Sequence, residues 1–167
     1  MSFPDDLTRY PGPVYLGDGE ISATYRPATQ APELTRSNVS VHYLATGRTT
    51  GGKFGLYRWE MGPGRGGPGP HFHRTLSESF YVLSGSVRIY DGKNWVDTGP
   101  GDWVHVPEGG VHGFRNESGA PASMLIHFSP GAPREAYFEG IANLAEMTEE
   151  ERAAFYLEHD NIWLPDT

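Results

Sequence analysis

The sequence predicts an all-β protein of a single domain, an antiparallel sandwich or barrel with helix only near its C-terminal end. Three observations lead to this fold class. The 167 residues match the length of one domain with a proper core. The 22 glycines and 14 prolines are spread along the chain, which favours many short strands joined by turns. The apolar runs in the middle of the chain have the length of strands, and no helical repeat lies between them.

The composition divides the chain into three segments, of which the first two are an arm and a region of strands. Residues 1–38 are rich in proline, glycine and polar residues, and we interpret them as an N-terminal arm with one or two short strands. Residues 39–132 carry the β-type runs, with turn residues between them. The predicted strands are Val39–Ala45, Phe54–Glu60, Ser79–Leu83, Val87–Tyr90, Trp103–Val106 and Met124–Phe128. Asp91-Gly92 predicts a hairpin after Tyr90, because glycine readily adopts the positive φ of a tight turn.

The third segment, residues 133–167, is predicted to be helical. The run from Thr148 to Glu151 has the form of a capping box, and the apolar residues after it fit a short amphipathic helix. Residues 134–145 are a candidate for a second helix. The segment contains too many aromatic residues for a disordered tail. We therefore predict that it packs on the outside of the barrel, with Trp163 buried and a mainly structural role. The alternative is that it borders the mouth of the cavity and helps to select the substrate.

Composition and charge exclude several classes of function. The formal charge of −8 argues against nucleic acid or an anionic membrane as a partner, since both require a basic surface. The absence of cysteine excludes a disulfide framework, a thiolate metal site and a cysteine nucleophile. The N-terminal residues lack the pattern of a signal peptide, and the apolar runs are too short to cross a membrane. We expect a cytoplasmic protein whose partner is a small-molecule substrate.

Two short runs of the sequence together offer three imidazoles and one carboxylate. His71 and His73 point to the same side of an extended chain, and Glu78 follows after room for a turn. His112 is distant in sequence, but an antiparallel barrel can place it beside the first run. Imidazole and carboxylate suit divalent first-row metals, so we predict one divalent transition metal ion at these four residues. The ligand types accommodate Fe, Mn, Ni, Co, Cu or Zn, and the sequence does not decide among them.

Strand alternation also suggests a substrate pocket beside this site. If Glu78 points inward, so do Phe80 and Val82, and if His112 points inward, so does Phe114. These three residues would form an apolar, partly aromatic wall suited to a small organic molecule. The other interpretation is that they form ordinary barrel core, and the sequence leaves both open.

The two runs closely resemble the paired signature motifs of the cupin superfamily. The first motif, G-x5-H-x-H-x(3,4)-E-x6-G, is matched by His71, His73, Glu78 and Gly85, with Arg65 in place of its leading glycine. The second, G-x5-P-x-G-x2-H-x3-N, is matched throughout by Gly101, Pro107, Gly109, His112 and Asn116. The resemblance covers about residues 40–130. It implies a double-stranded β-helix, which is a small jelly-roll barrel, and it implies the same four metal ligands.

Within that superfamily the chain is similar to single-domain proteins of the quercetin-dioxygenase-like type. The resemblance implies a metal-dependent, dioxygenase-like oxidoreductase acting on a small aromatic or unsaturated molecule. A non-redox isomerase or lyase, and a small-molecule binding or sensing protein without turnover, remain open. No catalytic residue is assigned beyond the ligands. We also expect a homodimer, because Tyr81 and Leu83 have outward parity and small jelly rolls leave sheet faces and edges to be covered.

Overall fold

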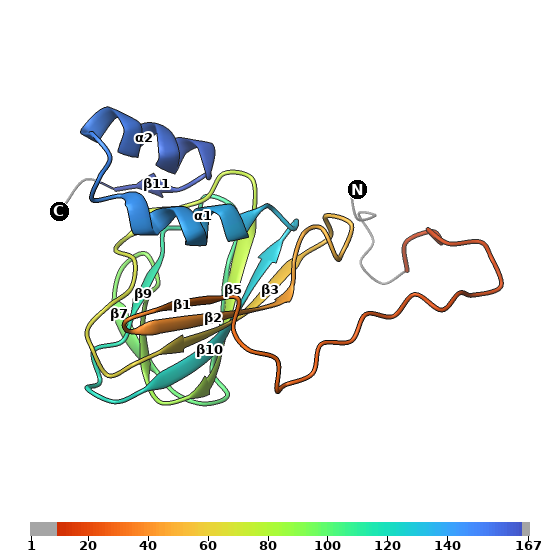
Figure 1. Cartoon of the computed structure of the whole chain (residues 1–167), viewed down its shortest axis with the longest axis horizontal. Coiled ribbons are helices and arrows are strands. Elements are labelled where there is room, and N and C mark those ends of the chain that lie inside the picture. Colours follow the sequence, from red (N-terminus) through yellow and green to blue (C-terminus); the bar gives the residue numbers. More distant parts are fainter. Residues whose placement is uncertain (1–9, 165–167) are drawn as a thin grey trace.

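The computed structural model describes residues 10–164, and the first nine residues of the predicted arm and the last three of the chain lie outside this range. The strands are β1 (Leu34–Arg36), β2 (Val39–Ala45), β3 (Gly55–Met61), β4 (His71–Phe72), β5 (Ser77–Ser84), β6 (Val87–Tyr90), β7 (Trp95–Thr98), β8 (Trp103–Val106), β9 (Gly113–Arg115), β10 (Ala122–Ser129) and β11 (Ile162–Trp163). The helical elements are α1 (Arg134–Gly140), the 3-10 turn η1 (Ile141–Asn143) and α2 (Glu149–Glu158). Figure 1 shows the helices at one end of the barrel.

The strands of the described chain form a barrel of antiparallel sheets. A six-stranded sheet has the order β1-β2-β3-β10-β5-β8, a three-stranded sheet has the order β7-β6-β9, and β11 pairs with β4. In the large sheet, β10 lies between β3 and β5, with Ile126 opposite Tyr57 on one side and opposite Phe80 on the other. The all-β prediction is confirmed, and every predicted strand coincides with an observed one to within two residues at each end.

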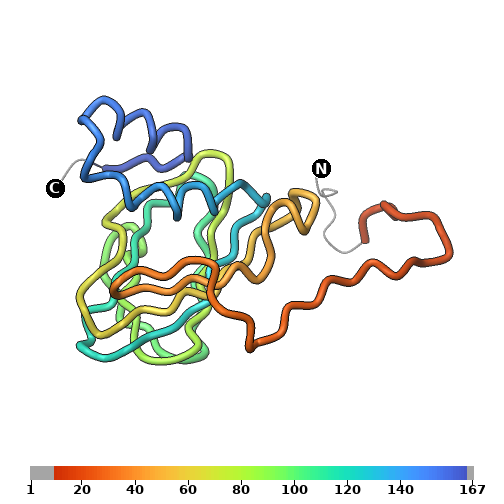
Figure 2. The backbone as a smooth tube through the Cα atoms, in the orientation of Figure 1, coloured from red at the N-terminus to blue at the C-terminus, as the bar shows by residue number. Residues whose placement is uncertain are grey.

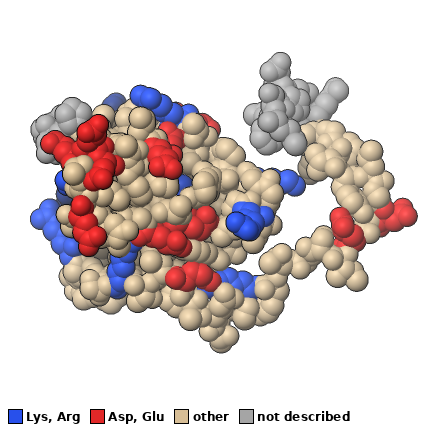
Figure 3. All heavy atoms as spheres, turned by 45° about the horizontal axis from the view of Figure 1, so that its top comes forward, with Lys and Arg blue, Asp and Glu red and all other residues tan. Residues whose placement is uncertain are grey.

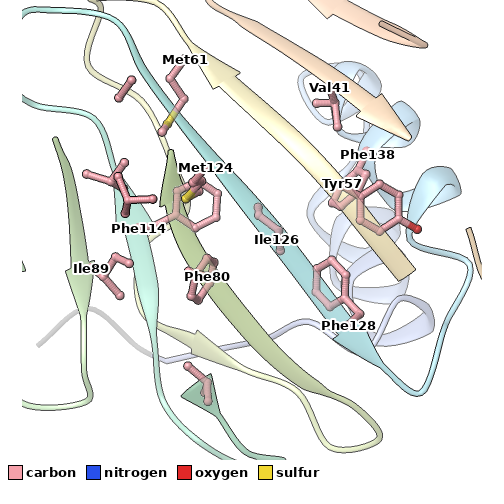
Figure 4. Close-up of a cluster of buried hydrophobic side chains, with 14 of the residues drawn as sticks. Val41, Tyr57, Met61, Phe80, Ile89, Phe114, Met124, Ile126, Phe128 and Phe138 are labelled. Carbon is pink, nitrogen blue, oxygen red and sulfur yellow. The ribbon is translucent and has the colours of Figure 1, made fainter. Parts of the chain in front are cut away.

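The core lies between the sheets and follows the two-residue period of the strands. Along β10 buried and half-buried residues alternate, and Met124, Ile126 and Phe128 point inward. Figure 4 shows Phe80 and Phe114 beside Met124, while Phe128 lies toward the helical end of the same core. Burying each such side chain stabilises the fold by about 1.5–3 kcal/mol before conformational entropy is subtracted. The core therefore fixes the register that positions the strands of the site.

The tight turns behave as the sequence predicts. Gly92 has a φ of +94° between β6 and β7, and the Asp91 carboxylate accepts hydrogen bonds from the backbone N–H groups of Lys93 and Asn94. Gly85, which follows β5, has a φ of +71°, and a Cβ there would lie 2.4 Å from the carbonyl oxygen of Pro121. A side chain at position 85 would thus meet both an unfavourable φ and backbone that cannot easily move.

The arm, as far as it is described, runs away from the barrel. Residues 10–33 extend from the body in Figures 1 and 2. The strand that ends the described part of the arm, β1, pairs with β2. Where the arm joins the body, Arg26 forms an ion pair with Glu33, whose carboxylate accepts the backbone N–H of Tyr43. Figure 3 shows that the arm carries few charged side chains. Its exposed apolar residues are Tyr10, Val14, Tyr15, Leu16, Ile21 and Tyr25.

The C-terminal segment confirms the helical prediction and corrects two details. Both hydrogen bonds of the Thr148–Glu151 capping box are present. The backbone N–H of Glu151 donates to the Thr148 hydroxyl at 3.2 Å, and the backbone N–H of Thr148 donates to the Glu151 carboxylate at 2.8 Å. α1 ends at Gly140, where a Cβ would meet the Phe155 ring of α2 at 2.6 Å. Trp163 is half-buried rather than buried, and it belongs to a short strand, β11, which the sequence pattern did not reveal. Within residues 10–164, no helix has the length and hydropathy needed to span a membrane.

Candidate metal centre

The fold brings together the four residues that the two motifs supply. One nitrogen or oxygen atom from each of His71, His73, Glu78 and His112 lies within 4.8 Å of the others, and all four side chains are buried. His71 lies on β4, Glu78 on β5, and His112 immediately before β9. The backbones of His71 and His112 exchange two N–H···O hydrogen bonds of 2.8 Å, so the two motifs are directly paired. This buried group could bind a metal ion.

Backbone carbonyls set the orientation of all three imidazoles. The Nδ1 atom of His71 lies 2.9 Å from the Gly69 oxygen, and that of His112 lies 2.9 Å from the Gly110 oxygen. The Nδ1 atom of His73 lies 2.6 Å from the oxygen of Asp160, which is far away in sequence. A carbonyl oxygen can only accept, so each Nδ1 carries the proton and each Nε2 of a neutral ring presents a lone pair. Such contacts on the outer nitrogen are the usual way in which metal-binding histidines are oriented.

The inner atoms of the group suit a cation. One carboxylate oxygen of Glu78 lies 3.0 Å from Nε2 of His73 and 2.8 Å from Nε2 of His112. With Nδ1 protonated, a neutral ring would direct its Nε2 lone pair at the carboxylate, which is unfavourable unless a proton or a metal ion neutralises the repulsion. Three nitrogens and one carboxylate oxygen are donors that divalent first-row metals accept. The residues therefore fit the predicted ion.

Electrostatics within the group follow from burial and from the pairing of unlike charges. Burial alone would raise the pKa of the Glu78 carboxyl, but His112 and His73 outweigh it and lower the pKa. Burial would lower the pKa of His112, yet the Glu78 carboxylate raises it. For His71 burial dominates and, with the help of His112, lowers the pKa to about 3. His71 is thus neutral at physiological pH, as a metal ligand must be.

A cavity of about 330 Å³ adjoins the group and has His71 and Glu78 on its wall. Most of the wall is apolar or aromatic, a composition common in pockets for small organic molecules. Its aromatic lining residues are Trp59, Phe114, Phe128, Tyr137, Phe138, Tyr156 and Trp163. Of the three predicted pocket residues, Phe114 lines this cavity, whereas Phe80 and Val82 lie in the packed core. Phe80 still lies near the site, with its ring centroid 6.0 Å from that of His112.

The C-terminal segment contacts the candidate site and borders the cavity, in line with the alternative role considered from the sequence. The carbonyl of Asp160 orients His73, and the Asp160 side chain accepts hydrogen bonds from the backbone N–H groups of Arg74 and Thr75. Trp163 pairs with His71 across β11 and β4, and the ring centroids are 5.0 Å apart. Arg134 also lines the cavity. Sequence reasoning missed Asp160 and Arg134, because neither belongs to a motif and both act through tertiary contacts.

The remaining histidines are engaged elsewhere. His42 contacts Arg58 and Glu60, His105 contacts Ser79, and the His127 ring stacks on Phe54. The His159 ring lies against Phe155, 4.5 Å between centroids. Asn116 of the second motif has a structural part, since its amide donates to the carbonyls of Gly62 and Ala120.

Comparison with known proteins agrees with this geometry. Residues 57–128 match the family model described as a cupin domain. The chain is 35% identical over 48 residues to a quercetin 2,3-dioxygenase of Bacillus subtilis (strain 168), a match covering 29% of this chain and 14% of that protein. It is 36% identical over 61 residues to an uncharacterized protein of Aquifex aeolicus (strain VF5), covering 36% of this chain and 50% of that protein. The chain therefore spans half or less of the length of these two relatives.

Solved structures resemble this fold at low sequence identity. The structure of KdgF from Halomonas sp. has a TM-score of 0.58 and 15% identity, covering 68% of this chain and 97% of that one. A predicted oxalate decarboxylase from Thermotoga maritima has a TM-score of 0.57 and 21% identity, covering 65% of this chain and 99% of that one. At such identities the likeness concerns the fold alone. The family model identifies residues 57–128 as a cupin domain, and the fold of the chain agrees with it.

Proposed function

We propose that the protein is an enzyme that holds one divalent transition metal ion at His71, His73, Glu78 and His112 and acts on a small organic molecule in the adjoining cavity. The observation that carries this proposal is the orientation of the three imidazoles. Each Nδ1 is held by a carbonyl, the Nε2 atoms of His73 and His112 face the Glu78 carboxylate, and one donor atom of His71 lies within 4.8 Å of the group. A plain structural core gains nothing from burying four such groups together.

The chain's own residues would position the substrate and exclude water from it. Trp59, Phe114 and Phe138 present aromatic surface to the cavity, which favours a flat, unsaturated molecule. A divalent ion at the centre would act as a Lewis acid toward a substrate oxygen and, if redox-active, would allow reaction with O₂. Imidazole and carboxylate ligands leave open which metal this is.

For the reaction itself we propose dioxygenation, with O₂ as the second substrate and both of its oxygen atoms entering the product. Two features support this choice over a non-redox reaction. One is the local similarity to a quercetin 2,3-dioxygenase, and the other is the aromatic lining of the cavity. An isomerase or lyase would use the same ligands without consuming O₂, as would a binding protein without turnover.

Oxygen uptake tests this proposal directly. Protein stripped of metal is reloaded separately with Fe²⁺, Mn²⁺, Co²⁺, Ni²⁺, Cu²⁺ or Zn²⁺ and mixed with a panel of phenols and enols that includes quercetin. We expect at least one redox-active metal to give O₂ uptake matched by loss of a substrate, and His112→Ala to abolish it. Substrate turnover without O₂ uptake would indicate an isomerase or lyase. Binding of a panel compound without turnover, whichever metal is loaded, would refute the proposal that the protein is an enzyme.

We further propose that the protein is a homodimer. Tyr81, Leu83 and Trp103 expose 43%, 39% and 64% of their surface on strands β5 and β8, and Tyr81 lies directly opposite Trp103. β8 is an edge strand of the large sheet, so this outer face has an unpaired border. The apolar, weakly charged arm of residues 10–33 extends away from its own barrel and could cover such a face on a second copy.

Light scattering checks the dimer. We expect the wild type to have about twice the chain mass of 18.4 kDa at micromolar concentration. Trp103→Asp should shift the protein toward monomer, because it places a charge in the proposed interface. The matched control is Leu157→Asp on α2, where the leucine is equally exposed, at 64%. A wild type of single-chain mass, or an unchanged mass for the Trp103 variant, would contradict the proposal.

A further inference from the structure

A buried arginine lies on the wall of the cavity and has no part in the predicted metal site. Arg134 is the first residue of α1 and is only 4% exposed. Its Nη1 donates to the carbonyl oxygen of His159 at 2.6 Å, and its Nη2 donates to the side-chain oxygen of Asn161 at 2.9 Å. Both acceptors are neutral. The guanidinium is therefore held firmly in place while its charge is not neutralised.

No carboxylate among residues 10–164 forms an ion pair with Arg134, and its Nε–H has no hydrogen-bond acceptor in that range. Instead the guanidinium packs against the rings of Phe128 and Tyr137, at 5.0 Å and 4.5 Å from their centroids. Aromatic faces attract a cation but do not neutralise it. Burying a charge without a counter-ion is costly, and buried charges in proteins are normally paired or bound to a metal ion. The unpaired guanidinium on the cavity wall is therefore placed to be paired by a ligand.

Among acidic groups, Glu78 has the largest electrostatic effect on the pKa of Arg134. Burial lowers the pKa of Arg134, and the strongest opposing effect is the negative charge of Glu78. A divalent ion at the metal centre would take up that charge. With a +2 ion, one carboxylate and one guanidinium, the enclosed site would carry a net charge of about +2. An anionic ligand in the cavity would offset this excess.

A second donor lies beside the arginine. The amide of Asn161 donates to the hydroxyl oxygen of Tyr137 at 2.8 Å, so the hydroxyl hydrogen remains available to another acceptor. Burial raises the pKa of Tyr137, which keeps the hydroxyl protonated at physiological pH. Tyr137 and Arg134 both line the cavity, and Asn161 holds both. Arg134, Tyr137 and Asn161 thus form a preorganised polar corner in an otherwise largely aromatic wall.

We propose that this corner binds a carboxylate of the substrate, so that the enzyme acts on a small organic acid whose unsaturated body packs against the aromatic wall. The inference deepens the proposed function and rests on it for the reaction, but not for the binding of the anion. A planar guanidinium suits a carboxylate because its N–H groups form charge-assisted, directional hydrogen bonds. The cavity volume of about 330 Å³ fits a molecule of the size of a one-ring aromatic acid.

The test compares benzoate with its uncharged isostere benzamide. Dissociation constants are measured through the fluorescence of the cavity tryptophans, Trp59 and Trp163, on metal-loaded and on metal-free protein. We expect the metal-loaded wild type to bind benzoate at least about tenfold more tightly than benzamide. Metal-free protein should keep a smaller preference of about threefold, because Glu78 then repels the anion. Arg134→Met should bring the ratio close to one in both states.

Control variants separate this site from general charge effects. Arg88→Met removes a positive charge from β6, where the arginine pairs with Asp97 and Glu117, and should leave the ratio unchanged. If Arg134→Met does not fold, Arg134→Lys decides, since it keeps the charge but loses the planar donor group. The Arg134→Lys variant should bind benzoate at least about threefold more weakly than the wild type, and its affinity for benzamide should be unchanged.

The inference and the proposed function fail in different ways. A wild type without preference for benzoate in either state would overturn the carboxylate site, as would an Arg134→Met protein that keeps the full preference. The latter result would place the anion on the metal or elsewhere. If no metal binds, the proposed function fails, and the metal-free comparison of wild type with the Arg134 variant still judges the carboxylate site.

Discussion

Adding Co²⁺ to metal-free wild type is expected to raise the melting temperature by about 5–10 °C. A ligand that binds only the folded state at a hundred times its Kd stabilises it by about 2.7 kcal/mol. For a chain of this size each kcal/mol corresponds to about 2–4 °C. Glu78→Gln should lose most of this shift, because it removes the one anionic ligand of the group while keeping the shape of the side chain. Differential scanning fluorimetry with and without Co²⁺ measures both effects.

The matched control for this prediction is His105→Ala. His105 is a histidine of β8 that stacks on Trp103 and contacts the Ser79 hydroxyl, outside the buried group. Its variant should respond to Co²⁺ as the wild type does. Equal stabilisation of the Glu78→Gln protein would mean that Co²⁺ binds elsewhere, and the assignment of this ligand would be wrong.

Deletion of residues 146–167 is expected to lower the melting temperature by about 10 °C and to weaken metal binding. The deletion removes α2 and β11, and with them Phe155, which packs against the core. Phe155 is partly buried, so its loss costs less than that of a fully buried aromatic side chain, which is about 3–5 kcal/mol, and the loss of Tyr156 and Trp163 adds to it. Metal affinity should fall about 10- to 100-fold, the usual cost of losing an outer hydrogen bond to a ligating histidine, because the Asp160 carbonyl no longer orients His73.

Two smaller changes isolate the causes of that effect. Leu157→Ala alters an exposed residue of α2 and should change the melting temperature by less than about 2 °C. Asp160→Ala removes the hydrogen bonds to Arg74 and Thr75 that fix the segment, and should weaken metal binding more than it lowers stability. A truncated protein with unchanged metal affinity would show that the C-terminal segment merely covers the site.

The barrel and the grouping of the four candidate ligands were predictable from sequence because their signals are local. Strands of four to eight residues carry alternating apolar side chains, and Gly92 marks its hairpin by itself. Glu78 and His112 lie far apart in sequence, and the resemblance to the paired cupin motifs was what grouped them. The capping box at Thr148 also needed only four consecutive residues.

What the sequence could not show depends on tertiary contacts. β11 consists of two residues, and it is a strand only because β4 lies beside it. The role of Asp160 comes from its backbone carbonyl, which leaves no trace in residue type. Phe80 and Phe114 share an inward parity, but Phe114 lines the cavity and Phe80 does not, and strand alternation alone cannot distinguish the two positions. Arg134 reads as an ordinary surface residue at the start of a helix until its burial is known.

The central claim is that the buried histidine and glutamate group holds a metal ion, and elemental analysis of protein purified without a histidine tag tests it most directly. We expect close to one equivalent of a divalent transition metal per chain in the wild type after dialysis against metal-free buffer. The His71→Ala/His73→Ala double variant, confirmed to be folded by circular dichroism, should contain almost none. Metal content near one equivalent in both proteins would contradict the account.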